Sequence, residues 1–290
     1  MTATPPPTYA ATVKPDECAL ITEKFARRLA WPFARLAHRL GWSANAVTLA
    51  AGLAWMLSLP LVVVAGVLLG RGQAVAGWVL WLTAGTLWNI GYILDLADGS
   101  LARMTGTARP SGFYLDYVFH LLFKPAYLAS LGMALSLASP GGWPAAAFLL
   151  LAVLSIPANW SASSAAVEHV LCEETGKGRH CPDSATDPAA HERLWLGATD
   201  SHAAASGKMR GLLTPLRVVA QEVLSYYGQF SFFSFLALLD LVWAALSRPP
   251  FPLPFTTVAF TFLSLALTLR IPFRVARDFR RVRDGMDAKP

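Results

Sequence analysis

Charged residues are scarce in this chain. They make up 14% of its 290 residues, whereas 54% are hydrophobic. A soluble globular domain carries about 25% charged residues, so the composition argues against an ordinary soluble protein and favours a membrane protein.

Cysteine is also rare, and no signal peptide is recognisable. The three cysteines are Cys18, Cys172 and Cys181, too few for a disulfide framework, and we expect reduced thiols. The first residues lack the basic start and short apolar core of a signal peptide, so we expect the first span to stay in the mature protein. Residues 1–17, rich in proline, threonine and alanine, are predicted to be disordered.

Long apolar stretches are abundant instead. Each is close to the length that crosses a bilayer as a helix, and they lie at about 46–70, 73–95, 112–137, 143–160, 219–246 and 254–273. The sequence therefore predicts an all-α integral membrane protein with six transmembrane helices. The membrane domain would cover residues 43–283, with a polar segment at about 165–217 and a short tail at 284–290.

Residues 18–42 have an amphipathic pattern, with large apolar residues on one side and basic residues between them. The apolar members are Leu20, Phe25, Leu29, Phe33, Leu36 and Leu40, and the basic members are Lys24, Arg27, Arg28, Arg35 and Arg39. This pattern predicts an interfacial helix on an anionic cytoplasmic leaflet. The alternative is a solvated helix that packs on a domain.

Basic residues also predict the orientation. Of the 24 lysines and arginines, 21 lie on the side that holds both termini, the loop after the second span and the 165–217 segment. Two lie on the other side, Arg71 and Arg248, and Lys124 lies within a span. Both termini are therefore expected to be cytoplasmic. The many arginines and alanines favour a bacterial plasma membrane.

Charged and small residues recur at a helical spacing at the end of the second span. Asp95, Asp98, Gly99, Ala102 and Arg103 follow the spacing i, i+3, i+4, i+7 and i+8, which places them on one face of a helix. A bare carboxylate in a membrane is costly, so converging carboxylates indicate a function and a counter-cation.

A second stripe follows on the next span. Gly112, Asp116, His120 and Lys124 recur every four residues and would face the first set. Together the two sets resemble the signature of the CDP-alcohol phosphatidyltransferase family, D-x2-D-G-x2-A-R, eight residues, then G-x3-D-x3-D. Seven of its eight fixed positions match, which would occur by chance on the order of 10⁻⁹ times per starting position. At the eighth position, His120 replaces the fourth aspartate of the family.

The resemblance implies phospholipid biosynthesis, in which a phosphatidyl group passes from CDP-diacylglycerol to a small hydroxylated or phosphorylated acceptor and CMP is released. The family also contains enzymes that transfer a phosphobase from a soluble CDP-alcohol to a lipid alcohol, and the motif does not separate the two. A catalytically silent member that binds CDP-lipid is a further interpretation. Relatives are typically homodimers, so we expect one here, and we expect no nucleic-acid partner.

The motif residues suit this chemistry. Divalent metal ions stabilise charge on phosphate oxygens, and Mg²⁺ or Mn²⁺ prefers the oxygen ligands that Asp95, Asp98 and Asp116 supply. In the family the eighth position is the presumed general base and a metal ligand, so His120 is expected to serve as base or ligand beside Asp116. An inactive site is the alternative.

Small and basic residues are expected to bind the nucleotide and phosphate groups. Gly99, Ala102 and Gly112 would let the substrate approach the backbone, and Arg103 would bind phosphate oxygens with its forked guanidinium. Lys124 is expected to contact the phosphate or the acceptor, or else to neutralise the aspartates.

Residues ahead of the first span resemble another family stretch near the nucleotide site, P-N-x-[IV]-T. Asn45 and Thr48 match it, although Ser43 or Asn45 could simply cap the helix. Further polar residues in or near the spans could line the site or form hydrogen bonds between helices; they are Asn89, Asn159, Gln221, Glu222 and Asp240.

Overall fold

The computed structural model describes residues 25–107, 110–139, 226–247 and 253–287, together with Tyr9, Ala147 and Leu150. Within these residues every regular element is a helix and there is no strand. The helices are α2 (Arg27–Arg39), α3 (Ala44–Gly70), α4 (Ala74–Thr105), α5 (Pro110–Ala138), α10 (Tyr226–Ser247) and α11 (Pro254–Asp287). The all-helical class predicted from the sequence is confirmed for this part of the chain.

Among the described helices, four contain a stretch that is long and apolar enough to cross a membrane. These stretches are Ala44–Gly70, Ala74–Thr105, Val118–Ala138 and Gln229–Leu246. The shortest has 18 residues and is about 27 Å long at 1.5 Å per residue, close to the ~30 Å of a hydrocarbon core. The membrane class predicted from the composition is therefore supported by four candidate spans.

The two other predicted spans are not among these four. The apolar part of α11, Pro254–Leu269, is shorter, although the helix itself continues to Asp287. Apart from Ala147 and Leu150, the predicted span at 143–160 lies outside the described residues, as do the segment at 165–217 and, except for Tyr9, residues 1–17.

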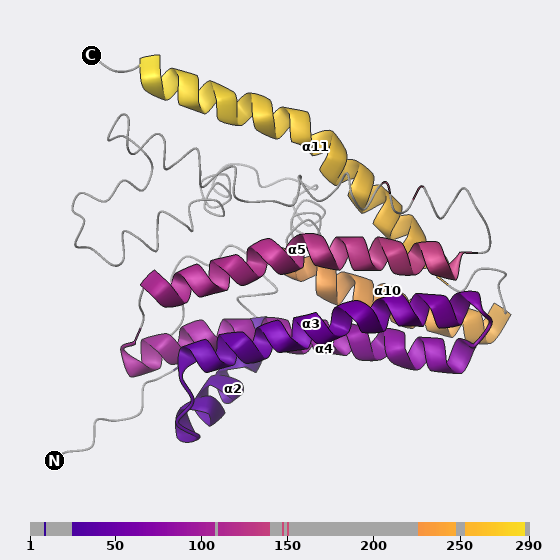
Figure 1. Cartoon of the computed structure of the whole chain (residues 1–290), viewed down its shortest axis with the longest axis horizontal. Coiled ribbons are helices and arrows are strands. Elements are labelled where there is room, and N and C mark those ends of the chain that lie inside the picture. Colours follow the sequence, from indigo (N-terminus) through magenta and orange to yellow (C-terminus); the bar gives the residue numbers. More distant parts are fainter. Residues whose placement is uncertain are drawn as a thin grey trace, which may run out of the picture.

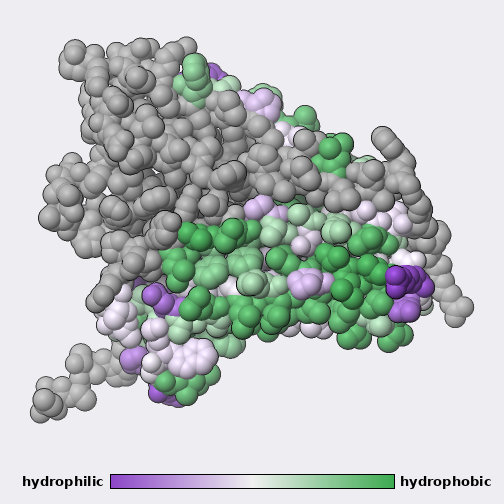
Figure 2. Space-filling view, in the orientation of Figure 1, coloured by the Kyte–Doolittle hydropathy of each residue, from purple (hydrophilic) through white to green (hydrophobic). Residues whose placement is uncertain are grey.

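The long helices lie side by side, with α3 packed against both α4 and α5, and α10 packed against α4 (Figure 1). Figure 2 shows mainly apolar side chains along α3 and α4, and hydrophilic groups gathered where these helices end. An apolar band between polar ends is the surface expected of helices that face lipid.

Glycines set how closely these helices approach one another. A Cβ atom at Gly66 on α3 would overlap the backbone of Ala134 on α5. At Gly91 on α4, a Cβ would overlap the indole of Trp55 on α3. Small residues let helix backbones come close in a membrane, where van der Waals packing replaces the hydrophobic effect as the driving force. These contacts fix the register of α3 against its neighbours.

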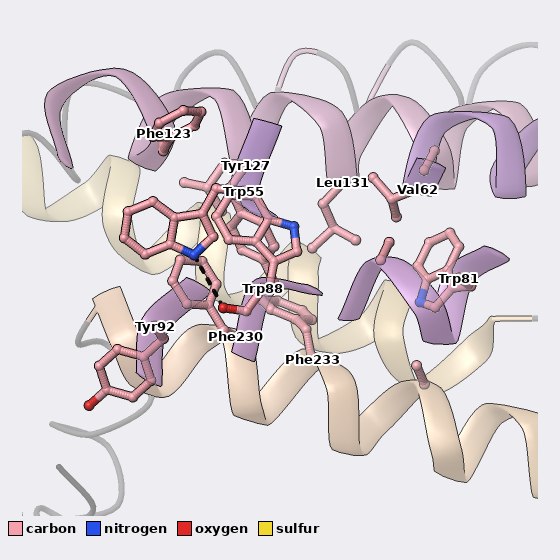
Figure 3. Packing of buried hydrophobic residues seen from close by; sticks show 14 of the residues in the cluster. Trp55, Val62, Trp81, Trp88, Tyr92, Phe123, Tyr127, Leu131, Phe230 and Phe233 are labelled. Carbon is pink, nitrogen blue, oxygen red and sulfur yellow. Dashed lines mark hydrogen bonds between the residues drawn. The ribbon is translucent and has the colours of Figure 1, made fainter. Parts of the chain in front are cut away.

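An aromatic cluster joins α3, α4, α5 and α10 (Figure 3). The ring of Trp88 on α4 stacks on Phe230 of α10 and meets Tyr127 of α5 edge-on, with centroid distances of 4.5 Å in both pairs. The indole Nε1 of Trp55 on α3 donates a hydrogen bond of 3.2 Å to the carbonyl oxygen of Trp88. Each such aromatic pair stabilises a fold by about 0.5–1.5 kcal/mol beyond its burial.

Polar groups connect α10 to its neighbours. The carboxylate of Asp240 accepts hydrogen bonds from the N–H of Thr256 at 2.9 Å and of the preceding residue at 2.7 Å, which caps the start of α11. The amide nitrogen of Asn89 donates to Ser234 Oγ at 2.9 Å, and its oxygen accepts from Ser231 Oγ at 2.9 Å. Both residues thus form hydrogen bonds between helices.

Helix α2 packs through alanines. Ala30, Ala34 and Ala37 are buried, and α2 lies against α4. The large apolar residues of this segment are instead 46–69% exposed, and they are Phe25, Leu29, Phe33, Leu36 and Leu40. Helix α2 covers Arg27–Arg39 of this segment and contains Pro32, while its position at a membrane interface stays a prediction. Residues 18–24 lie outside the described part of the chain.

Candidate active site

A glycine turn connects the two halves of the motif. Helix α4 ends at Thr105, and the next residue, Gly106, has a φ of 64° in the left-handed region. The N–H of Thr107 donates to the carbonyl oxygen of Ala102 at 2.9 Å and closes the helix end. Glycine adopts this conformation without a steric penalty. Helix α5 then begins at Pro110 and runs back along the bundle (Figure 1).

Three motif side chains converge across this pair of helices. The Nε2 atom of His120 lies 3.1 Å from Oδ1 of Asp116, one turn away on α5, and 3.5 Å from Oδ1 of Asp95 on α4. The exposed fractions of the side chains are 6% for Asp95, 16% for His120 and 33% for Asp116. We call these three residues the DDH group. It is deepest at Asp95 and opens towards Asp116.

The geometry of the DDH group suits a divalent cation. One ligand atom from each residue lies within 4.8 Å of the others. An octahedral ion with bonds of about 2.1 Å places neighbouring ligands about 3 Å apart and opposite ligands about 4.2 Å apart. The two distances from His120 Nε2 are close to the value for neighbouring ligands, so small side-chain adjustments would suffice to hold an ion.

Asp98 takes a different position. Its Oδ2 atom lies 2.5 Å from the hydroxyl of Thr48 on α3, and among the described residues it is not one of the three in the DDH group. Its charged neighbours include Asp116 and Arg103, so it lies beside the group. The predicted nucleotide-site residue Thr48 thus contacts a motif carboxylate, and this contact anchors α4 to α3.

The predicted phosphate-binding residues of α4 lie together. A Cβ atom placed on Gly99 would lie 3.5 Å from Nη1 of Arg103, an ordinary van der Waals distance. Packing between described residues therefore does not require glycine at this position. Ala102 and Arg103 are half-buried, and Gly112 lies in the first turn of α5. The small residue beside the guanidinium leaves space next to the carboxylates.

Asn45 and Lys124 are the remaining predicted site residues. Asn45 is exposed in the first turn of α3, and the cap of that helix is Ser43, whose hydroxyl accepts a 3.2 Å hydrogen bond from the N–H of Ala46. Lys124 lies on α5 one turn after His120, and its side chain is outside the described part of the structure.

Sequence reasoning did not identify Trp55 as part of the site. Its ring lies 5.8 Å from the ring of His120 and 5.6 Å from that of Phe123. The indole thus packs beside the imidazole. The indole of Trp55 fits against Gly91 on α4. This pairing of a large and a small residue becomes recognisable only when the two helices are aligned.

A cavity of about 430 Å³ lies deeper in the bundle. Aromatic residues of the central cluster, including Trp88 and Tyr127, line it, and Asn89 adds a polar group. Its lining also includes Ile90 on α4 and Leu238 on α10, which are exposed. The cavity therefore reaches the apolar surface between these two helices.

The comparisons with known proteins assign no family to this site. No protein-family model, no curated protein sequence and no solved structure matches the chain. The functional interpretation therefore depends on the motif residues and on their arrangement.

Proposed function

We propose that this protein is a membrane-embedded CDP-alcohol phosphotransferase of phospholipid biosynthesis. It transfers a phosphatidyl group from CDP-diacylglycerol to a small hydroxylated or phosphorylated acceptor and releases CMP. The observation that carries the proposal is the convergence of Asp95, Asp116 and His120. These residues belong to the two halves of the motif, and their carboxylates are concentrated at one end of apolar helices, where bare charge is costly.

In this proposal the side chains divide the chemistry among them. The acceptor hydroxyl forms a new P–O bond with the lipid-linked phosphorus of the donor, and the phosphoanhydride bond breaks so that CMP leaves. A carboxylate oxygen of Asp116 that does not bind the metal takes the proton of the hydroxyl, because an imidazole whose Nε2 binds a metal has no second basic nitrogen. Arg103 binds phosphate oxygens. Asp95, Asp116 and His120 would hold a divalent ion, which would neutralise negative charge on those oxygens.

The position of Thr48 supports a further role. Its hydroxyl contacts Asp98, so the α3 segment that resembles the nucleotide-site stretch is coupled to the motif. We propose that Thr48 holds Asp98 in place and that the start of α3, with Asn45, contacts the nucleotide. Gly99, Ala102 and Gly112 leave room for the donor phosphates.

The surroundings of the site suit a substrate with an apolar tail. The cavity lined by Trp88 and Asn89 reaches the lipid-facing surface, and we propose that it receives an acyl chain while the charged headgroup lies at the DDH group. Helix α2 fits the same arrangement. Its exposed face of large apolar residues, beside the exposed Arg28, Arg35 and Arg39, would lie in the headgroup region of an anionic leaflet.

The complete topology of the proposal has six spans, with both termini and the site on the cytoplasmic side of a bacterial plasma membrane, in a homodimer. Support for the side comes from the distribution of basic residues, of which 21 of 24 lie on one side of the expected spans.

Release of CMP tests the function. Purified protein would be given CDP-diacylglycerol, Mg²⁺ or Mn²⁺, and a panel of neutral and phosphorylated alcohols. We expect release with at least one acceptor, loss in His120→Ala and retention in His120→Asp. His38→Ala is a matched control, because His38 is an exposed histidine on α2. An inactive wild type together with an active His120→Asp variant would identify a silenced relative and reject the proposal.

A further inference from the structure

The DDH group combines two kinds of metal ligand. Asp95 and Asp116 offer carboxylate oxygens, and His120 offers an imidazole nitrogen that lies 3.5 Å and 3.1 Å from them. Mg²⁺ prefers oxygen ligands and gives up its water slowly, whereas imidazole suits the first-row transition metals. We propose that the DDH group selects a transition-metal dication such as Mn²⁺, Fe²⁺, Co²⁺ or Zn²⁺ over Mg²⁺, and that His120 determines this selectivity.

The helical spacing supports binding through His120. Asp116 and His120 are four residues apart on α5, a separation that places two side chains on the same face one turn apart, as in helical zinc-binding motifs. Asp95 on α4 adds the third ligand from a second helix. A three-ligand site with one partly open side leaves positions for water or substrate oxygens.

Charge also favours the transition metals. The DDH group has two carboxylates, and the third motif aspartate, Asp98, is engaged by the Thr48 hydroxyl outside it. An aspartate in place of His120 would add one negative charge and one oxygen ligand. Mg²⁺ binding depends on such charge, whereas the bond to an imidazole nitrogen strengthens from Mn²⁺ towards Cu²⁺. The ring of Trp55 packs 5.8 Å from that of His120, whose Nε2 faces both carboxylates.

The inference rests on the proposed function, because it names the metal class of the proposed transferase site, but it can be tested without substrate. Purified full-length protein would be stripped of metal with a chelator and titrated with Mn²⁺, followed by electron paramagnetic resonance, with Mg²⁺ as competitor. Electron spin-echo modulation would report whether a nitrogen-14 nucleus is bound to Mn²⁺. Absorption of bound Co²⁺ gives an independent measure of ligand number.

We expect Mn²⁺ to bind about ten-fold or more tightly than Mg²⁺ in the wild type, with a nitrogen signal. The His120→Asp variant should lose the nitrogen signal and bring the two affinities within about three-fold of each other, whereas His38→Ala should behave like the wild type. Equal affinities in the wild type, or bound Mn²⁺ without nitrogen, would overturn the inference even if no variant folds.

The outcomes separate this inference from the function. Selective binding through nitrogen without release of CMP under any condition would reject the transferase and leave the metal site. Release of CMP that is best supported by Mg²⁺, with no nitrogen bound to Mn²⁺, would reject the metal selectivity and leave the transferase.

Discussion

The contact between Thr48 and Asp98 can be removed with a nearly isosteric change. Thr48→Val replaces the hydroxyl with a methyl group of similar size and removes the 2.5 Å hydrogen bond to Asp98 Oδ2. Asp98 is only 8% exposed, so water cannot readily replace the lost donor. The hydroxyl also lies 3.1 Å from the carbonyl oxygen of Ala44, but its single proton favours the nearer and more negative acceptor.

The size of the effect follows from the charge of the acceptor. A hydrogen bond to a charged group contributes about 1.5–3 kcal/mol, and a buried group left without it loses this stabilisation. A factor of ten in rate corresponds to 1.36 kcal/mol. If catalysis requires Asp98 to be held in place, losing this hydrogen bond would therefore lower the rate of CMP release by about ten- to hundred-fold. The same change should lower the temperature at which the detergent-purified protein unfolds.

Two controls separate this contact from a general effect of losing a hydroxyl. Thr48→Ser keeps the donor and should retain most activity. Thr83→Val makes the same replacement at an exposed position of α4, where the hydroxyl donates only within its own helix, to Val79 O at 2.7 Å. The reasoning is wrong if Thr48→Val has wild-type activity and unfolding temperature, or if Thr83→Val is equally impaired.

Three further substitutions test other parts of the structure. Gly99→Ala should fold normally, because its Cβ meets only Arg103 at 3.5 Å, yet lose CMP release if phosphate occupies that space; normal activity would contradict this role. Asn89→Leu removes two hydrogen bonds to α10 and should destabilise the protein by about 1 kcal/mol, whereas Thr86→Val, whose hydroxyl bonds within α4, should not. Gly66→Leu would overlap the backbone of α5 and should prevent stable folding, which size-exclusion chromatography would report as aggregation; a monodisperse, stable variant would refute the tight crossing.

The helices themselves were predictable because the membrane leaves few alternatives. A backbone surrounded by lipid must satisfy its hydrogen bonds internally, so an apolar stretch of sufficient length is expected to be helical. The spans predicted at 46–70 and 112–137 accordingly fall within α3 and α5, and the span predicted at 73–95 falls within α4 except for its first residue. The convergence of the motif was also expected, since a fixed spacing on each of two consecutive helices places the residues on facing stripes.

Contacts across the bundle were not predictable from spacing. Thr48 and Asp98 are 50 residues apart, and which α3 residue meets the motif depends on how closely α3 crosses α4 and α5. That crossing is set by glycines such as Gly66 and Gly91, whose partners appear only in three dimensions. In α2 the large apolar residues dominated the pattern, but small residues such as Ala34, which is fully buried, make the contact with the bundle.

In the proposed function, the length of α4 would let one helix serve both a charged headgroup and an apolar tail. It has 32 residues and is about 48 Å long at 1.5 Å per residue, well beyond a hydrocarbon core of about 30 Å. Where the polar turn before Ala74 marks one edge of the hydrocarbon, Asn89 lies about 22 Å along the helix, within the core, and Asp95 lies about 32 Å along it, at the opposite edge. The carboxylates then avoid the full cost of burial in lipid, while the cavity beside Asn89 stays at the depth of acyl chains. If the proposed function is correct, this offset would place the headgroup of a nucleotide-activated lipid at the carboxylates and its acyl chain in the cavity.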